Sequence, residues 1–221
     1  MTTPPRPHHR RDAQAEHAAS APPPATRAAT PSEALAVAGV LARAFVDDPV
    51  QRYLLTTDEQ WATRAAPIFE RIVRRTLVIG VVEVTPRLEG AALWLPPGTD
   101  FMQGPRGLYF ALLSAWDART HLRRTVTLVR TLQKYHPREP HWYLPLVGTD
   151  PVQQGRGVGS ALLTRALARA DAAGLPVYLE SSTERNVPFY RRHGFEVVGH
   201  IAIPGGPELW PMRREPTPRP A

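Results

Sequence analysis

The stretch Trp142-Tyr143-Leu144-Pro145-Leu146-Val147-Gly148-Thr149, followed after four residues by Gln154-Gly155-Arg156-Gly157-Val158-Gly159-Ser160, decides the fold of this 221-residue chain. The first segment predicts a strand. The second places three glycines at alternate positions directly before an amphipathic helix, whose apolar face includes Leu162, Leu163, Leu167 and Ala170. Such a turn exposes backbone N–H groups at the positive end of a helix dipole, where a pyrophosphate binds well.

The spacing of these glycines excludes two common nucleotide motifs. Counting from Gly155 puts Ser160 where the dinucleotide fingerprint needs its third glycine, and counting from Gly157 puts Leu162 there. An ATP-binding P-loop also fails, because no Gly-Lys-Ser/Thr follows. A plain strand-to-helix turn, in which the glycines only permit tight geometry, is the alternative to a phosphate site.

Helical and strand patterns alternate on both sides of this stretch, which predicts a mixed α/β fold with one strand-helix-strand unit and an antiparallel C-terminal pair of strands. We expect a first helix from about Leu35 to Phe45, ended by Asp47-Asp48-Pro49. The other expected helices are 59–77, 105–116, 119–133, 158–172 and 187–193, and the expected strands are 78–84, 90–95, 142–149, 177–181, 195–203 and 209–213. Residues 26–29 are expected to be a short extended piece.

Length and composition favour one soluble domain. The chain is too short for two full domains, its hydrophobic fraction is 43%, and no apolar run approaches the roughly 18 residues of a membrane span. Residues 1–24 are rich in Pro, Ala and Arg, so we expect a disordered tail, then a catalytic domain at 25–214 and a disordered tail at 215–221. The N-terminus lacks the pattern of a secretory signal, which favours a cytoplasmic protein with no membrane association.

The absence of cysteine excludes disulfides, thiolate metal sites and a cysteine acyl-enzyme. The eight histidines show no metal-ligand spacing, so no metal is predicted. The net charge of +7 raises the question of nucleic acid, but about four of the seven charges belong to the two ends of the chain, residues 1–31 and 213–221. The basic stretch from Arg119 to Arg138 carries apolar residues at helical spacing, which favours the solvated face of an ordinary helix.

The glycine loop and the segments after it resemble the Gcn5-related N-acetyltransferase (GNAT) superfamily. Its acetyl-CoA motif, a strand followed by Gln/Arg-x-x-Gly-x-Gly/Ala and a helix, is matched by Gln154, Gly157 and Gly159. The strand ending in Leu179-Glu180, the helix with Tyr190 and the following His193-Gly194-Phe195 stand in the order of that family. The resemblance implies a central mixed sheet of six to seven strands flanked by helices on both faces, and an acetyl-CoA-dependent N-acetyltransferase.

The resemblance also implies roles for individual residues. Tyr190 matches the general acid that protonates the departing thiolate, and Glu180 is the candidate base that deprotonates the amine directly or through water. Tyr190 as a packing aromatic and Glu180 as a solvated strand end or a partner of Arg185 are the alternatives. Backbone N–H groups at 146–149, next to an expected irregularity at Pro145, are candidates for oxyanion stabilisation. The residues expected to bind acetyl-CoA are Val147, Gly148, Thr149, Gln154, Gly155, Arg156, Gly157, Val158, Gly159, Ser160 and Asn186.

The acceptor amine is the least determined part of the prediction. The stretches 136–140, 179–182 and 185–190 look like those of puromycin N-acetyltransferase and related actinobacterial enzymes, which implies a small-molecule primary amine and a role in antibiotic resistance or biosynthesis. Asp48 stands where that subgroup has a tyrosine, and an acidic residue there would attract a cationic amine instead. Direct transfer in a ternary complex is favoured, although Ser181 and Ser182 leave a serine acyl-enzyme formally possible.

Other function classes stay open at this point. A CoA-binding sensor would keep the loop without depending on Tyr190, a protein or peptide N-acetyltransferase would use the same chemistry, and a basic nucleic-acid-binding protein would bind in a salt-dependent manner without acetyl-CoA. Nucleic acid is the least favoured of these partners. A homodimer is compatible with the sequence, which does not determine the oligomeric state.

Overall fold

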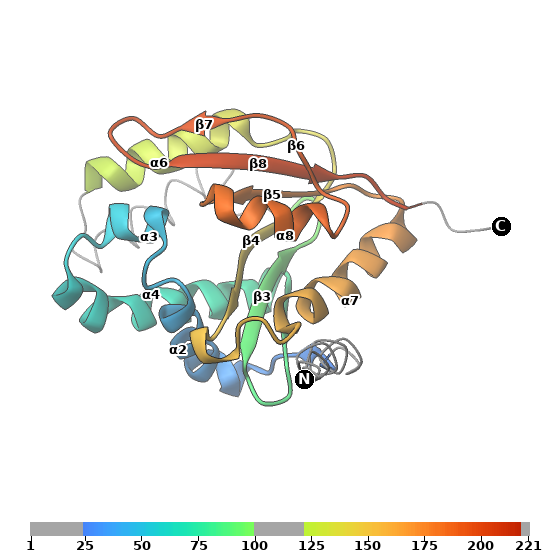
Figure 1. Ribbon diagram of the computed structural model, residues 1–221, viewed down its shortest axis with the longest axis horizontal. Coiled ribbons are helices and arrows are strands. Elements are labelled where there is room, and N and C mark those ends of the chain that lie inside the picture. Colours follow the sequence, from blue (N-terminus) through green and yellow to red (C-terminus); the bar gives the residue numbers. More distant parts are fainter. Residues whose placement is uncertain (1–23, 100–121, 218–221) are drawn as a thin grey trace, which may run out of the picture.

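The structure is a computed structural model and describes residues 24–99 and 122–217 (Figure 1). The predicted helix at 105–116, nearly all of the predicted tail at 1–24 and the last four residues lie outside these ranges. The strands are β1 (Arg27–Ala28), β2 (Val81–Val84), β3 (Gly90–Leu95), β4 (Trp142–Thr149), β5 (Val177–Ser181), β6 (Glu196–Val197), β7 (Ile201–Ala202) and β8 (Glu208–Arg214). The helices are α2 (Ala34–Ala44), α3 (Pro49–Leu54), α4 (Asp58–Ile79), α6 (Leu122–Tyr135), α7 (Val158–Ala173) and α8 (Val187–Arg191).

A mixed sheet organises the described residues. Its strand order is β1-β2-β3-β4-β5-β8-β6, with β7 paired to β8. Only β4 and β5 are parallel, and α7 connects them as the predicted strand-helix-strand unit. The predicted α/β fold with its antiparallel C-terminal strands is therefore confirmed.

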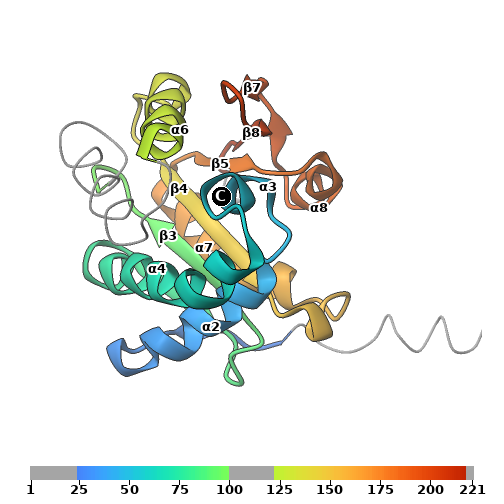
Figure 2. The same cartoon turned by 90° about the vertical axis from the view of Figure 1, so that its left-hand side faces the viewer.

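Helices cover both faces of this sheet. β3 is therefore buried along its whole length, and its side chains alternate between two cores. Ala91 and Leu93 pack against α2 and α4. Ala92 and Trp94 pack against α7 and α8 on the opposite face. In Figure 2, α4 and α6 lie on one side of β3 and β4, and α8 lies on the other. The prediction of helices on both faces is confirmed.

The C-terminal half of the sheet differs in detail from the prediction. The expected strand at 195–203 is two short strands, because β6 and β7 both pair with β8 but are separated at residues 198–200. The described sheet consequently has eight strands, where six or seven were expected. The apolar composition of this segment did not indicate that its pairing with β8 is interrupted around Gly199.

Two helix boundaries also correct the prediction. Asp48 does not belong to a helix end: its carboxylate accepts hydrogen bonds from the backbone N–H groups of Val50 and Gln51 at 3.0 and 2.9 Å, and so starts the short helix α3. Pro49 occupies the first turn of α3, where no N–H donor is needed. Residues 78 and 79, expected in a strand, continue α4, whose last backbone bond joins Gly80 N–H to the carbonyl of Thr76.

The two parallel strands separate soon after they meet. β4 pairs with β5 only at Trp142 and Tyr143, although β4 continues to Thr149. On its other edge, β4 stays paired with β3, with an extra residue between Tyr143 and Leu146 that makes a bulge. This bulge contains Pro145, as expected from a residue that offers no N–H to the ladder. The free edge of β4 beyond the bulge faces the gap that separates it from β5.

Candidate active site

A cleft of about 710 Å³ occupies the space where β4 and β5 diverge. Its walls come from the free edge of β4, the end of β5, the loop before α7, the start of α3 and the helix α8. The region lies at the carboxyl ends of two parallel strands, which is where open α/β sheets bind ligands. The volume of the cleft is within the range of small-molecule binding sites.

The loop before α7 has the geometry of an anion site. Gly155 and Gly157 have φ angles of 76° and 78°, a left-handed conformation that a residue with a Cβ adopts only at a cost. In the described part of the chain, the backbone N–H groups of residues 155–160 have no backbone acceptor. They include the first turn of the 16-residue helix α7, so the dipole of that helix favours negative charge at the same place.

Further contacts hold the loop in position. The side chain of Gln154 donates to the carbonyl of Thr149 at 3.4 Å. At the other end of the loop, Ser160 Oγ and His193 Nε2 lie 3.0 Å apart, which ties α7 to the segment after α8. Gly159 leaves room for Phe189, whose ring carbon would lie 3.2 Å from a Cβ at that position.

Asp48 lies in the cleft and is partly buried at the start of α3. Besides the two backbone N–H groups of α3, the hydroxyl of Ser182 donates a short hydrogen bond to its Oδ2. Burial raises the pKa of Asp48, while the hydrogen bonds from Ser182, Gln51 and Val50 act in the opposite direction. The carboxylate is thus a desolvated acidic group, held in a fixed direction between α3 and the end of β5.

Tyr190 lines the cleft from α8 and is only 8% exposed. Its ring packs against Phe189 and Phe195, with centroid distances of 5.1 and 6.0 Å, so the packing role considered for this residue is present. Burial, and then the negative charge of Asp48, raise the pKa of its phenol above the ordinary value near 10. Tyr190 therefore keeps its proton at neutral pH, which an acid requires before it can donate.

Glu180 reaches the cleft from β5, yet its side chain is only 6% exposed. The hydroxyl of Tyr143 donates to its Oε2 at 2.8 Å, whereas Oε1 has no hydrogen-bond partner among the described residues. This position is not the solvated strand end considered above, and no described ion pair joins Glu180 to Arg185. A buried carboxylate with an unsatisfied oxygen is a poor structural element and a suitable proton acceptor.

The cleft unites all of the predicted site residues except one. Arg156 belongs to the loop but does not line the cleft, and its side chain is exposed. Gly148 lines it and also has a packing role, because a Cβ there would meet Ala44 and Phe45 of the α2 region at 2.9 and 3.0 Å. Sequence reasoning missed several lining residues that no motif marks: Phe45, Asp47, Gln51, Leu132, Tyr143, Thr183, Arg192 and Leu209.

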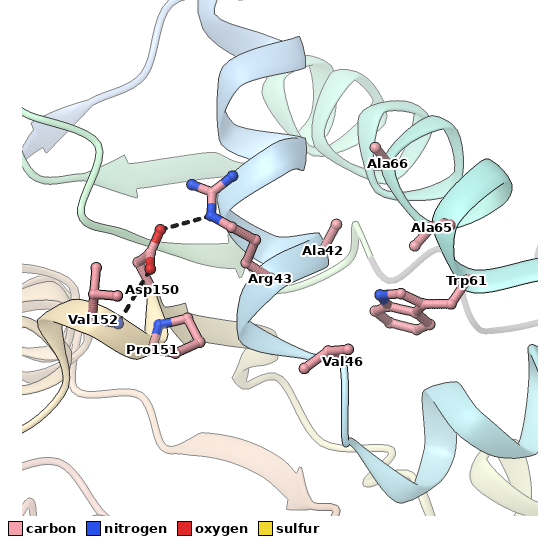
Figure 3. Close-up of a pocket in the computed structure, with 10 residues that line it drawn as sticks. Ala42, Arg43, Val46, Trp61, Ala65, Ala66, Asp150, Pro151 and Val152 are labelled. Carbon is pink, nitrogen blue, oxygen red and sulfur yellow. Dashed lines mark hydrogen bonds and ion pairs between the residues drawn. The ribbon is translucent and has the colours of Figure 1, made fainter. Parts of the chain in front are cut away.

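A second hollow of about 430 Å³ lies between α2, α4 and the turn after β4 (Figure 3). Its lining is mostly apolar, with Val46 and the ring of Trp61 beside alanines of both helices. The charged groups at its edge are already paired, since Arg43 Nε donates to Asp150 Oδ2 at 2.8 Å. This hollow offers no acid, base or anion-binding loop, and the candidate site is therefore the larger cleft.

Comparisons with known proteins agree with this geometry. A family model for the acetyltransferase (GNAT) domain matches residues 118–197. An uncharacterized N-acetyltransferase of Schizosaccharomyces pombe is 32% identical over 169 residues, which cover 72% of this chain and 68% of the relative. The chain belongs to the GNAT acetyltransferase family.

Solved structures place it among GNAT folds. The crystal structure of the histone acetyltransferase HPA2 and related acetyltransferase from Corynebacterium glutamicum is 30% identical, with a TM-score of 0.66 over 90% of this chain and all of that one. Arylalkylamine N-acetyltransferase 2 from Aedes aegypti, at 14% identity and a TM-score of 0.54 over 87% of this chain and 98% of that one, shares the fold alone.

Membership in the GNAT family makes the protein an acetyltransferase, and the enzymes of this family use acetyl-CoA as co-substrate. The cleft fits that molecule, because the loop 155–160 offers free N–H groups to a pyrophosphate and the unpaired edge of β4 offers backbone groups to an extended arm. Residues 24–99 and 122–217 contain no cluster of side chains that could hold a metal ion. Within the same ranges, no helix is long and apolar enough to cross a membrane.

Proposed function

We propose that this GNAT protein transfers the acetyl group of acetyl-CoA to the primary amine of a small cationic molecule, by direct attack in a ternary complex. The observation that carries the proposal is the convergence of Asp48, Glu180 and Tyr190 on the cleft that also contains the glycine loop. A carboxylate and a protonated phenol can perform amine deprotonation and thiolate protonation, and the second carboxylate favours a cationic amine. The proposed catalytic domain spans residues 25–214, in a cytoplasmic protein.

The binding half of the proposal assigns acetyl-CoA to the loop and to β4. The pyrophosphate lies on the N–H groups of residues 155–160, and Gln154 and Asn186 lie beside it on the cleft wall. The free edge of β4, from Val147 to Thr149, pairs with the pantetheine arm and directs backbone N–H groups toward the thioester. Arg156 is exposed at the mouth of the loop, where it is suited to the 3′-phosphate of CoA.

The chemical half assigns one proton transfer to each catalytic residue. Acetyl-CoA, when bound, supplies the thioester carbonyl that the amine attacks. Glu180 accepts a proton from the ammonium form of the acceptor, either directly or through a water molecule, and so frees its lone pair. Tyr190 donates its proton to the departing sulfur as the C–S bond breaks, and the phenol, whose pKa is raised, takes back the second proton that the nitrogen loses as the amide forms.

The acidic character of the acceptor end favours a cationic substrate. Asp47 and Asp48 line the cleft from the turn before α3, and Glu180 lies across from them. Val50, Leu132 and Leu209 add apolar surface at the same end, which would contact the body of a small molecule. An antibiotic or a biosynthetic amine of this type agrees with the resemblance of 179–182 and 185–190 to puromycin N-acetyltransferase, whereas Asp48 points to a different acceptor within that class.

A panel of amines tests the proposal. CoA release from acetyl-CoA is followed by a thiol reagent with puromycin, aminoglycosides, polyamines, free amino acids and peptides with a free N-terminus, and product masses confirm where the acetyl group goes. We expect turnover with cationic small molecules and little with uncharged amines. Selective acetylation of peptides would replace the small-molecule assignment by a peptide acceptor, and binding of acetyl-CoA without turnover of any amine would refute the proposal.

A further inference from the structure

Next to Glu180 lies a buried cluster of rings that the catalytic scheme does not use. It consists of His136, His141, Tyr143 and Tyr178, and both histidines are less than a tenth exposed. The ring of His136 packs edge-on against Tyr143 and Tyr178, with centroid distances of 4.8 and 5.3 Å. The cluster joins the end of α6 and the start of β4 to the strand that carries Glu180.

The hydrogen bonds of the two histidines determine which ring nitrogen of each carries a proton. His141 Nδ1 lies 2.7 Å from the carbonyl oxygen of Glu139, and because a carbonyl only accepts, Nδ1 of His141 carries a proton. His141 Nε2 lies 3.0 Å from His136 Nε2, so one of these two nitrogens donates. When His141 is neutral, its Nε2 accepts, and the donor is Nε2–H of His136.

The remaining nitrogen of His136 faces the candidate base. His136 Nδ1 lies 3.8 Å from Oε1 of Glu180, the oxygen that has no hydrogen-bond partner in the described ranges. In the neutral pair described above, Nδ1 of His136 is an acceptor that faces a carboxylate. This contact becomes favourable only when a proton lies between them, on Glu180 or on His136. A hydrogen bond needs an approach of roughly 1 Å, and such contacts commonly tighten in the complex with substrate.

We propose that His136 and His141 form a proton relay that removes the acceptor's proton from Glu180 and carries it away from the cleft. The inference rests on the proposed function of Glu180 as the base. Glu180 takes a proton from the ammonium, Oε1 passes one proton to Nδ1 of His136, and Nε2 of His136 passes its own to Nε2 of His141. His141 is 8% exposed as a residue and His136 6%. His141 releases its Nδ1 proton to solvent once the hydrogen bond to the Glu139 carbonyl opens, and exchange of tautomers in both rings resets the pair.

The relay accounts for the proton balance of the reaction. One ammonium and one thioester give an amide, a thiol and one free proton, so each turnover must release a proton from a base that is only 6% exposed. Among the described residues, the groups in contact with His136 include the carboxylate of Glu180, the phenols of Tyr143 and Tyr178, and the ring of His141. Tyr178 holds its own proton, because burial and the charge of Glu180 raise its pKa. Each histidine ring has one nitrogen that donates and one that accepts, so the histidines are the cluster members that can pass a proton on.

Kinetics with His136→Gln and His141→Gln test the relay. Glutamine keeps polarity and volume but cannot pass a proton through a ring. We expect kcat with the best acceptor to fall by about 10- to 100-fold, with the KM for acetyl-CoA unchanged, and to rise again with the concentration of an imidazole buffer. The wild-type enzyme and His200→Gln, an exposed histidine beside Glu208, should show no such buffer dependence. A loss of rate that no buffer restores, in variants with normal melting temperatures, would overturn the relay.

Nitrogen-15 NMR of the wild-type histidine rings supplies a readout that needs neither turnover nor a variant. The relay requires a proton on Nδ1 of His141 and on Nε2 of His136 at a pH where both rings are neutral. Glu180→Gln should then change the ring signals of His136 and His141 but not those of His200. The opposite tautomers, or no response to Glu180→Gln, would overturn the relay even if acetyl transfer is observed. If no amine in the panel is acetylated, the proposed function is refuted, and this outcome is distinct from the tautomer measurement, which tests the relay alone.

Discussion

Replacement of Asp48 separates its role in the fold from its role in the site. The carboxylate accepts from Val50 N–H, Gln51 N–H and the Ser182 hydroxyl, and it does so while partly buried. Asparagine caps a helix as well as aspartate and keeps the same volume, so Asp48→Asn should change the free energy of unfolding by less than about 1 kcal/mol. Asp48→Ala also loses the cap, which costs a further 0.5–2 kcal/mol, or about 1 kcal/mol typically.

The pH dependence of this effect has a definite sign. Burial raises the pKa of Asp48 in the folded state, so the folded protein binds this proton more tightly than the unfolded chain does. The contribution of Asp48 to stability is therefore largest below the ordinary aspartate pKa near 3.9 and is lost as the pH rises through the folded value. Asp48→Asn removes that loss, and its stability relative to wild type should improve from acidic to neutral pH in urea titrations.

The catalytic consequence should be much larger than the change in stability. Loss of a desolvated charge that faces a cationic amine should lower kcat/KM for that acceptor by about 10- to 100-fold, equivalent to about 1.4–2.7 kcal/mol. Binding of acetyl-CoA should not change. Asp47→Asn, which removes an exposed charge from the same cleft wall, should lower kcat/KM less than Asp48→Asn does, because solvent screens the Asp47 carboxylate. Equal kcat/KM for wild type and Asp48→Asn with a cationic acceptor would refute the assigned role.

Three further substitutions test the loop, the packing of the site and the C-terminal strand. Gly157→Ala should weaken acetyl-CoA binding in calorimetry. Gly205→Ala introduces the same left-handed strain of about 1–2 kcal/mol in a distant turn and should leave the affinity for acetyl-CoA intact. Equal affinities of the two variants would contradict the anion-binding role of the loop. In urea titrations, Gly148→Ala should destabilise the fold by about 1–3 kcal/mol, because its Cβ would meet Ala44 and Phe45. The control Gly39→Ala should stabilise helix α2 by about 0.5–1 kcal/mol. A stabilised Gly148→Ala variant would show that α2 does not pack against Gly148. Asp171→Asn should cost about 1 kcal/mol at neutral pH, because the hydrogen bond from Arg214 lowers the pKa of Asp171. This contribution of Asp171 to the free energy of unfolding is present above a pH near 3.9 and is lost as the pH falls through the lower pKa of the folded state. A wild type that remains more stable than Asp171→Asn in strong acid would contradict the assigned ion pair.

The parts of the molecule that were predictable depend on local chemistry. The strand, loop and helix from Trp142 to Ala173 were recognisable because three glycines, a helix start and an apolar stripe lie within about thirty residues. The irregularity of β4 followed from one property of Pro145, its missing N–H donor. The glycine loop and the mixed sheet therefore needed no knowledge of distant contacts.

The parts that were not predictable depend on contacts between distant segments. Asp-Pro is compatible with a helix end or a helix start, and only packing of α3 over the cleft decides between them. The bond from Ser182 to Asp48 joins residues 134 positions apart, and the bond from Tyr143 to Glu180 joins residues 37 apart. His136 and His141 had no metal-ligand spacing and no motif, so their place next to Glu180 appeared only once α6, β4 and β5 were assembled.

The central claim is that this cleft performs acid–base chemistry on an amine and acetyl-CoA. Single-turnover acetyl transfer to the best acceptor, with saturating acetyl-CoA, tests it in wild type and Tyr190→Phe. Phenylalanine keeps the packing against Phe189 and Phe195 and removes only the hydroxyl. The account predicts a rate lower by about 10²- to 10⁴-fold with unchanged acetyl-CoA affinity. A Tyr190→Phe enzyme that transfers acetyl at the wild-type rate would contradict it.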